Sequence, residues 1–272
     1  KKKLTSKKVK IKIFFKKNAY PGSARNLGIL KSKNSCIAFL DEKTIPEKNW
    51  LNNGYNKLKH KKIDIVYGQT VYVANQFKER IIISSTVGSN IHDTLPGSIV
   101  NKNVFFKCGY FLESVRSGED GDWFKRIKLH KILSSKNNCI LKYMFSNIQI
   151  NKIFRKWFIY YKSSAHLDQL KTHRQIYIIT MLTFLMVFIY NWNHIFADWD
   201  QSSNIYIHHI TKKTILYLTM LYVFFRGIFL PLYKGSKISF LFPFNFILVF
   251  AFSLFLDFIK TYCYLTSYFR KT

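Results

Sequence analysis

Cysteine motifs and acidic residues are both scarce in this sequence. The four cysteines, Cys36, Cys108, Cys139 and Cys263, show no CxxC spacing, which argues against a zinc site or a disulfide framework and favours reduced, buried thiols. Asp and Glu number 14 against 43 Lys and Arg. This basic excess points to nucleic acid, anionic lipid or a phosphorylated substrate. Lys, Asn, Ile and Phe are used heavily throughout, and no nucleic-acid-binding motif with interleaved aromatics occurs, so we expect no nucleic-acid partner.

Charge is scarcest in the last third of the chain. Residues 1–175 hold 35 basic and 11 acidic residues, whereas residues 176–272 hold 8 and 3. Three segments in that last part carry at most one charge, over residues 176–192, 214–233 and 238–256. Their lengths suit bilayer spans, and they lack the polar stripes of a soluble helical bundle. We therefore expect a transmembrane region over residues 176–272, with spans at about 176–192, 214–233 and 238–258.

The loops between these segments predict an orientation. The basic residues 1–175 and the short basic loop 234–237 favour the cytoplasmic side, which predicts a multi-pass protein of the cell (inner) membrane. Arg270 and Lys271 would then lie outside, so a re-entrant third segment is an alternative. Arg226 lies inside the second segment, where an arginine is functional or faces the protein interior. Its partner is either a lipid-linked phosphate or Asp257.

Short apolar runs alternate with turn signals through residues 1–150. Strand patterns cover residues 9–15, 35–40, 63–67 and 71–74, and residues 81–85 form a further short apolar run. Helical patterns cover residues 24–31, 44–51 and 123–133, whereas residues 140–150 are ambiguous. This alternation is typical of an α/β layered sheet. Residues 153–161 are aromatic and basic, which predicts an amphipathic interface helix within a linking segment at 151–175.

One stretch, residues 116–123, gathers three acids within four positions of this acid-poor chain. Gly118 permits a backbone conformation that other residues resist. The three acids, Glu119, Asp120 and Asp122, follow it at the expected start of a helix, where negative charge is stabilised. The stretch is either a capping device or a cluster of catalytic acids.

Three motifs in order decide between these readings. Residues 24–29 read Ala-Arg-Asn-Leu-Gly-Ile, a strand ends on Asp41-Glu42-Lys43, and residues 108–113 read Cys-Gly-Tyr-Phe-Leu-Glu before the acidic turn. Their order and spacing resemble glycosyltransferase family 2, the inverting, nucleotide-sugar-dependent enzymes of GT-A fold. The resemblance implies a partial GT-A (Rossmann-like) catalytic domain over residues 1–150, before the transmembrane region of about three helices.

The resemblance also assigns roles to residues. Inverting transfer needs a base that takes the proton of an acceptor hydroxyl. The family places this base at Asp120, with Glu119 and Asp122 orienting it or holding the acceptor. It implies donor binding by Arg25, Asn26, Asp41 and Lys43, and acceptor binding by Gly109, Arg116 and Trp157. Because acids close together raise one pKa, a base near neutral pH fits this cluster.

The donor side departs from the family pattern. The resemblance implies a divalent metal, Mn²⁺ or Mg²⁺, held by an Asp-x-Asp pair whose first member is Asp41. Lys43 replaces the second, and a charged lysine cannot ligate a metal. Either Lys43 neutralises the diphosphate directly, or donor binding is degraded. The family also opens with an apolar strand and a nucleotide-contacting loop, so we expect the chain to begin partway into the GT-A domain.

These observations predict a membrane-bound glycosyltransferase with its catalytic part in the cytoplasm. It would move a sugar from a nucleotide-sugar donor to a lipid-linked or polysaccharide acceptor, with membrane lipid as a further partner. Family analogy places such an enzyme in cell-envelope polysaccharide synthesis. The alternative is a catalytically incomplete transferase that acts as a membrane scaffold or partner subunit, which Lys43 and the expected missing opening favour.

Overall fold

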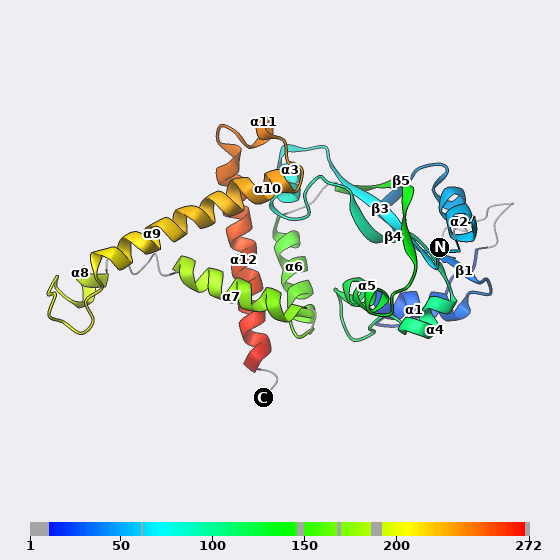
Figure 1. Ribbon diagram of the computed structural model, residues 1–272, viewed down its shortest axis with the longest axis horizontal. Helices are drawn as coiled ribbons and strands as arrows, with labels where there is room; N and C mark the ends of the chain where they lie inside the picture. The colour runs from blue at the N-terminus through cyan, green and yellow to red at the C-terminus, as the bar shows by residue number, and fades with distance from the viewer. Residues whose placement is uncertain (1–10, 61, 146–149, 168–169, 186–191, 270–272) are drawn as a thin grey trace.

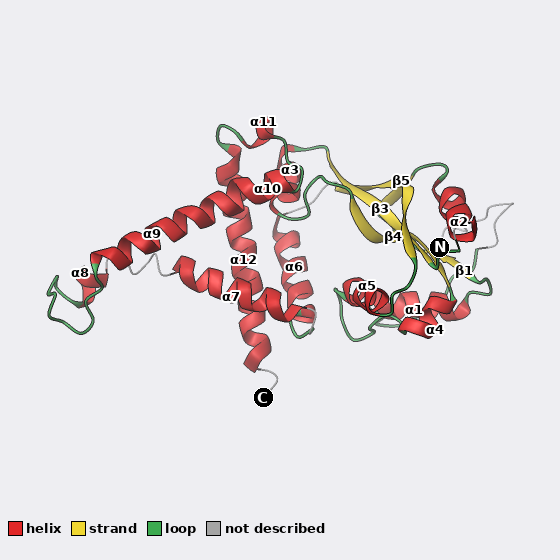
Figure 2. Ribbon diagram, in the orientation of Figure 1, coloured by secondary structure: helices red, strands yellow, loops and turns green. Residues whose placement is uncertain are grey.

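The computed structural model describes residues 11–60, 62–145, 150–167, 170–185 and 192–269 (Figure 1). An α/β domain lies at one end, and a group of helices formed largely by the second half of the chain lies at the other (Figure 2). Long strands reach from the first part towards the second. The expected α/β class is confirmed for the first part.

A five-stranded mixed sheet forms the centre of the α/β domain, in the order β1-β4-β3-β5-β2. The strands are β1 (Cys36–Ala38), β2 (Thr44–Pro46), β3 (Ile65–Ala74), β4 (His92–Asn101) and β5 (Ser134–Phe145). Only β3 and β5 pair in parallel, and the other three pairings are antiparallel. The sheet is therefore more antiparallel than the Rossmann-like arrangement that the sequence led us to expect.

Helices flank this sheet and connect its strands. Those of the α/β domain are α1 (Pro21–Lys31), α2 (Trp50–His60), α4 (Asn103–Cys108) and α5 (Glu119–Leu129), and α3 (Phe77–Ser85) connects β3 to β4. The acidic turn thus begins α5, as predicted. Gly118 precedes the helix with φ of 90°, in the left-handed region that favours glycine.

Three local predictions in this domain are wrong. The strand expected at 9–15 is absent over residues 11–15, and residues 9–10 lie outside the described residues. Residues 44–46 are strand β2 rather than the start of a helix, and Pro46 is tolerated there because β2 is an edge strand. The two expected strands at 63–67 and 71–74 form the single strand β3, which continues through a register shift at Gly68. A side chain at Gly68 would meet the Pro96 carbonyl at 2.1 Å, so the close approach of β4 requires glycine there.

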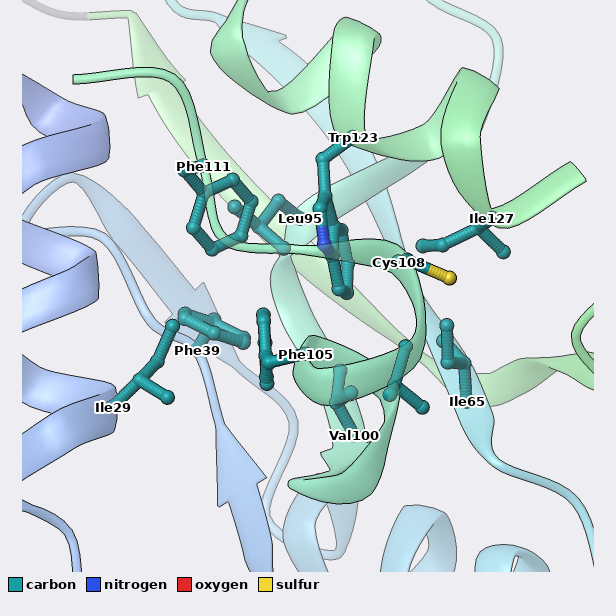
Figure 3. Close-up of a cluster of buried hydrophobic side chains, with 11 residues drawn as sticks. Ile29, Phe39, Ile65, Leu95, Val100, Phe105, Cys108, Phe111, Trp123 and Ile127 are labelled. Carbon is teal, nitrogen blue, oxygen red and sulfur yellow. The ribbon is translucent and has the colours of Figure 1, made fainter. Parts of the chain in front are cut away.

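The core of the domain is aromatic and sits between the sheet and the helices α1, α4 and α5 (Figure 3). Trp123 is fully buried and stacks on Phe105 with ring centroids 4.9 Å apart. Its indole N–H donates to the Gly109 carbonyl at 3.1 Å. Burial of Trp123 one turn into α5 fixes the start of that helix, and with it the acidic residues.

The helical part follows β5. Its helices are α6 (Ile150–Ser164), α7 (Lys171–Leu185), α8 (Trp192–Phe196), α9 (His209–Phe224), the π-helical turn η3 (Phe225–Phe229), α10 (Leu230–Tyr233), α11 (Ile238–Leu241) and α12 (Asn245–Phe269). The expected amphipathic helix at 153–161 lies within α6. The long helix α12 contacts α3, α6, α7 and η3, so it is the centre of this part (Figure 1).

Two helices in the described residues are long and apolar enough to cross a membrane, over Thr211–Tyr233 and Asn245–Ser267. The second begins later than the expected 238, because Pro243 follows the short α11 and cannot continue a helix. The first of the three expected spans includes residues 186–191, which lie outside the described residues.

Helix α3 belongs to the α/β domain by sequence but packs in the helical part. The apolar run at 81–85 forms most of α3, and Ile81 packs with Leu241 and Val249. The turn after α3 docks on the loop after α10, where Ser89 N–H donates to the Lys234 carbonyl at 2.8 Å. The two parts are therefore joined by this docked helix as well as by the chain between β5 and α6.

Candidate active site

Arg25 on α1 joins two of the predicted site segments. Its Nη1 lies 2.5 Å from Glu119 Oε1 at the start of α5, and its Nη2 lies 3.6 Å from Asp41 Oδ1 after β1. The Arg25 side chain is 18% exposed, and its guanidinium also lies over the Phe111 ring. The fold thus brings Arg25, Asp41 and Glu119 together from three elements, as the motif order predicts.

Glu119 is the buried acid of the turn. Burial raises its pKa first and the negative charge of Asp120 second, whereas a backbone hydrogen bond and Arg25 oppose the rise. The net direction is upward, so desolvation outweighs the ion pair. Glu119 Oε2 is buried and has no hydrogen-bond partner among the described residues. Glu119 therefore anchors the acidic turn from its buried side through Arg25.

The carboxylates of Asp120 and Asp122 have different hydrogen-bond partners. Asp120 is half-buried, and its Oδ1 accepts the Gly121 backbone N–H at 2.8 Å. Asp122 instead forms an ion pair with Arg126, at 2.8 Å. Arg126 also donates to the carbonyl of Tyr110 at 2.8 Å and to that of Cys108. Asp122 therefore fixes the turn before α5 through Arg126.

Two further predicted residues belong to this supporting framework. The buried Asn26 amide exchanges two hydrogen bonds with the Phe111 backbone, at 2.9 and 3.0 Å. It also donates to Glu113, whose pKa is lowered to about 2 by hydrogen bonds from Asn26, Lys16 and Ser23. Gly109 adopts φ of 75° beside Arg126 and accepts the Trp123 indole bond. Asn26 and Gly109 thus hold the chain that carries the acidic turn.

Three tyrosines outside the predicted site lie within electrostatic reach of the same carboxylates. Burial raises the pKa of Tyr72, Tyr143 and Tyr160, and the charge of Asp41 adds to the rise in each, while Arg116 opposes it at Tyr160. Asp120 also acts on Tyr72, and Glu119 acts on Tyr160. Tyr72 and Tyr143 are register partners on β3 and β5, with ring centroids 5.2 Å apart. The strand pairing that joins them was the missing signal, because residues 140–150 were ambiguous.

Cations lie on the α6 side of this group. Desolvation, and then the positive charges of Lys43 and Arg116, lowers the pKa of Lys156. Lys43 itself is exposed, and its backbone carbonyl accepts the Met144 N–H at 3.3 Å. The Arg116 backbone N–H donates to Ser163 Oγ at 2.6 Å, which ties the acidic turn to α6. Lys43, Arg116 and Lys156 are therefore close enough for their charges to interact.

The expected metal position is Asp41. Among the described residues, no three His, Cys, Asp or Glu side chains group as a protein-held metal would require. Asp41 has Arg25 at 3.6 Å and Lys43 two residues along the chain. A single carboxylate next to cations does not fit a metal held by the protein alone.

A cavity of about 510 Å³ lies between the acidic turn and the C-terminal helices. Ser117, Gly118 and Gly121 line one side, and the predicted residue Trp157 and Tyr160 line another from α6. The lining thus includes neighbours of Asp120 in the acidic turn, though not Asp120 itself, and it extends to α7 and α12.

Comparison with known proteins gives three findings. Residues 2–112 match the family model Glycosyl transferase family 2. A curated relative, an uncharacterized glycosyltransferase of Rickettsia bellii (strain RML369-C), is 30% identical over 128 residues, which are 43% of this chain and 18% of the relative. The chain thus matches about a fifth of that relative's length. A crystal structure of S. aureus TarS 1–349 in complex with UDP-GlcNAc is similar over 93% of this chain and 73% of that one, with 12% identity and a TM-score of 0.36.

Proposed function

We propose that this chain, whose residues 2–112 carry a family 2 glycosyltransferase domain, transfers a sugar from a nucleotide-sugar donor to a hydroxyl-bearing acceptor at a membrane. The family match bears out the recognition made from the motifs. It ends at residue 112, before the acidic turn, so the roles given to that turn rest on its geometry. The observation that supports the proposal is the bridge made by Arg25 between Asp41 and Glu119, which ties the turn that carries Asp120 to the segment that carries Asp41.

Asp120 is the proposed general base. A carboxylate oxygen of Asp120 takes the proton of the acceptor hydroxyl while the hydroxyl oxygen bonds to the anomeric carbon of the donor. Attack comes from the face opposite the diphosphate, so the configuration inverts. The bond from the anomeric carbon to the diphosphate oxygen breaks, and the nucleoside diphosphate leaves with the electron pair. Glu119 ties the turn that carries this base to Arg25.

The leaving diphosphate gains negative charge in this step. Lys43 and Arg116 act electrostatically on Lys156, and we propose that these three cations face the diphosphate. Preorganised cations at the site of developing charge lower the barrier of such a transfer. A divalent ion, if bound, would add the same charge stabilisation with Asp41 as its protein ligand. We propose that Lys43 takes over this work, so turnover proceeds without added metal.

Membrane association is proposed from the helical part. The segments Thr211–Tyr233 and Asn245–Ser267 have the length and composition of spans. Docking of α3 on these helices would hold the catalytic cleft at the membrane surface, and the basic charge of residues 1–175 favours the cytoplasmic face. A role in cell-envelope polysaccharide synthesis follows by family analogy.

A second candidate is a partner subunit without activity of its own. The observation that favours it is Lys43, which occupies the second acidic position of the family motif and cannot ligate a metal there.

One experiment separates the two candidates. The full chain in uncharged detergent is titrated by calorimetry with a panel of UDP-, GDP- and dTDP-sugars, with EDTA and with Mn²⁺. A catalytic chain binds at least one donor in EDTA and releases nucleoside diphosphate when acceptor is added, with inverted anomeric configuration by NMR. Absence of donor binding under both conditions overturns the transferase proposal for this chain and supports the partner subunit.

A further inference from the structure

The cavity beside the acidic turn has a charged residue at its far side. Gly118 and Gly121 line the end next to Asp120, Trp157 and Tyr160 line the α6 side, and Lys260 and Tyr264 line it from α12. Lys260 lies within the apolar segment Asn245–Ser267. A lysine in such a segment calls for a partner or a function.

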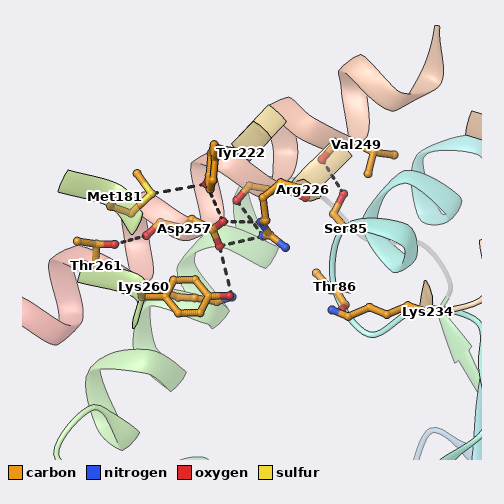
Figure 4. Close-up of polar contacts among 12 residues, drawn as sticks. Ser85, Thr86, Met181, Tyr222, Arg226, Lys234, Val249, Asp257, Lys260 and Thr261 are labelled. Atoms are coloured by element: carbon orange, nitrogen blue, oxygen red, sulfur yellow. Dashed lines mark hydrogen bonds and ion pairs between the residues drawn. The ribbon is translucent and has the colours of Figure 1, made fainter. Parts of the chain in front are cut away.

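Lys260 belongs to a buried cluster in which two cations share one carboxylate (Figure 4). Arg226 takes both oxygens of Asp257, with Nε at 2.6 Å from Oδ2 and Nη2 at 2.9 Å from Oδ1. The Lys260 Nζ lies 3.5 Å from Asp257 Oδ1 and donates to the Tyr177 hydroxyl at 2.8 Å. The single charge of Asp257 is thus engaged most closely by Arg226, and the cluster of these three residues carries one positive charge in excess.

This excess charge is poorly hydrated. The side chains of Arg226, Asp257 and Lys260 are 7%, 2% and 12% exposed. A buried charge without full compensation is costly, so an incoming anion would be favoured at this place. Lys260 also lies over the rings of Tyr161 and Tyr177, at 5.4 and 4.5 Å from their centroids, which holds the amine in position at the cavity.

The rest of the lining leaves this charge uncompensated. The described residues that line the cavity include no Asp or Glu. His173, which also lines it, has its pKa lowered by burial first and by the charge of Lys260 second, with Asp257 opposing the fall. Among the described residues that line the cavity, Lys260 is the one Lys or Arg side chain.

We propose that this cavity binds the acceptor, an amphiphilic lipid phosphate that carries a hydroxylated headgroup, and that Lys260 is the counter-ion of its phosphate. The assignment rests on the proposed function, because it takes the end of the cavity at Gly121 as the place of the attacking hydroxyl. The aromatic side chains Trp157, Tyr160 and Tyr264 then flank the headgroup between the two ends. The apolar surface of α12 suits the hydrocarbon chain, and Lys260 distinguishes a charged amphiphile from a neutral one.

The test is a binding measurement that needs neither donor nor turnover. The full chain in uncharged detergent is titrated by calorimetry with decyl phosphate, decanol and inorganic phosphate. Lys260→Met removes the charge and Lys260→Arg keeps it. Lys213→Met is the matched control, because Lys213 is exposed on α9 and does not line the cavity. Thermal unfolding of each variant verifies that it is folded before titration.

We expect decyl phosphate to bind about tenfold more tightly than decanol, the effect of one charge-assisted hydrogen bond. Lys260→Met should remove this preference, whereas Lys260→Arg and Lys213→Met should retain it. Equal affinity of the wild-type chain for decyl phosphate and decanol would overturn the assignment. So would a preference that survives in Lys260→Met, or inorganic phosphate binding as tightly as decyl phosphate. Because the readout is affinity alone, a chain that transfers no sugar can still show the site, and an active transferase can still lack it.

Discussion

The two parts of the molecule each contain a cluster built on one arginine, and the imbalance of charge is opposite in the two. In the α/β domain, Arg25 contacts two carboxylates, Glu119 and Asp41. In the helical part, Arg226 shares one carboxylate, Asp257, with Lys260. In the proposed function, the first cluster offers acids to a reaction and the second offers a cation to a ligand. One cavity is lined both by Gly118 and Gly121 of the acidic turn and by Lys260.

Burial also differs between the two clusters. Asp41 is 42% exposed, whereas Asp257 is 2% exposed. Exposed ion pairs contribute little to stability, while the loss of one partner of a buried pair leaves a charge stranded at high cost. The comparison therefore predicts that the cluster of Arg226, Asp257 and Lys260 contributes to stability as well as binding. The exposed contact between Arg25 and Asp41 should instead matter for the reaction.

Asp257→Asn should have the largest effect on stability of the variants that test this difference in burial. It leaves Arg226 and Lys260 without their carboxylate among apolar helices, and we expect a loss of about 3–5 kcal/mol in the free energy of unfolding. Chemical denaturation of the full chain in detergent measures it. Asp200→Asn, at an exposed position whose carboxylate accepts from Ser202, is the control and should leave the free energy of unfolding close to that of wild type. Equal losses for the two variants would contradict the role given to the buried cluster.

Gly88→Ala tests the contact that holds the two parts together. Gly88 has φ of 81°, and an added Cβ would lie 2.4 Å from both the Cβ and the carbonyl oxygen of Lys234. We expect a loss of about 1–3 kcal/mol and faster hydrogen exchange at residues 86–90. Gly28→Ala is the matched control, because nothing lies within 4 Å of its added Cβ and the position is helical. That variant should gain about 0.5–1 kcal/mol, and similar behaviour of both variants would show that the docked turn is not rigid.

Double-mutant cycles should give different coupling free energies for the two ion pairs of Arg25, with Glu119 and with Asp41. The side chains of Arg25 and Glu119 are 18% and 6% exposed, so their coupling should reach about 1–3 kcal/mol in a cycle of Arg25→Met with Glu119→Gln. The cycle with Asp41→Asn should give under about 0.5 kcal/mol, because Asp41 is more exposed and 3.6 Å away. Chemical denaturation of the full chain gives both values. A stronger coupling of Arg25 to Asp41 than to Glu119 would contradict the view that the buried pair with Glu119 is the stabilising one.

The smallest effect is expected at Glu113, beside the same cluster. Its pKa is held at about 2 in the folded chain, against 4.5 for the free side chain, so the stabilisation is present above the unfolded value. It is lost as the pH falls from about 4.5 towards 2. Because Glu113 is 51% exposed, we expect under about 1 kcal/mol after solvent screening. The difference in unfolding free energy between wild type and Glu113→Gln should shrink from pH 6 to pH 3, and a constant difference would refute this account.

The sequence was most informative where local motifs mark residues that the fold brings into contact. Arg25, Asp41 and Glu119 belong to three separate motifs, and Arg25 contacts both carboxylates, while the roles assigned to them stay predictions. The start of α5 after Gly118 was also predictable, since glycine, acids and a following apolar face are local signals. For Arg226, the sequence left two partners open, a lipid-linked phosphate and Asp257. The ion pair with Asp257 depends on the packing of two helices, which no local pattern specifies.

The sequence was least informative where the partner is distant. The run at residues 81–85 is rich in β-branched residues, yet it is helical because it packs on α12 and α11, more than 150 residues later. The pairing of Tyr72 with Tyr143 depends on a parallel register that no local pattern specifies. Roles in donor or acceptor binding for Asn26 and Gly109 stay predictions, and the structure adds that both support the turn that carries the acids.

The measurement that tests the central claim most directly is the turnover of Asp120→Asn. With the donor that the wild-type chain binds, release of nucleoside diphosphate in the presence of acceptor should fall at least about 100-fold, the usual contribution of a general base, while donor affinity is retained. Asp198→Asn is the matched control, because Asp198 is exposed at a positive φ that asparagine also tolerates, and its turnover should equal that of wild type. Undiminished turnover in Asp120→Asn would remove Asp120 from the role of base and contradict the account.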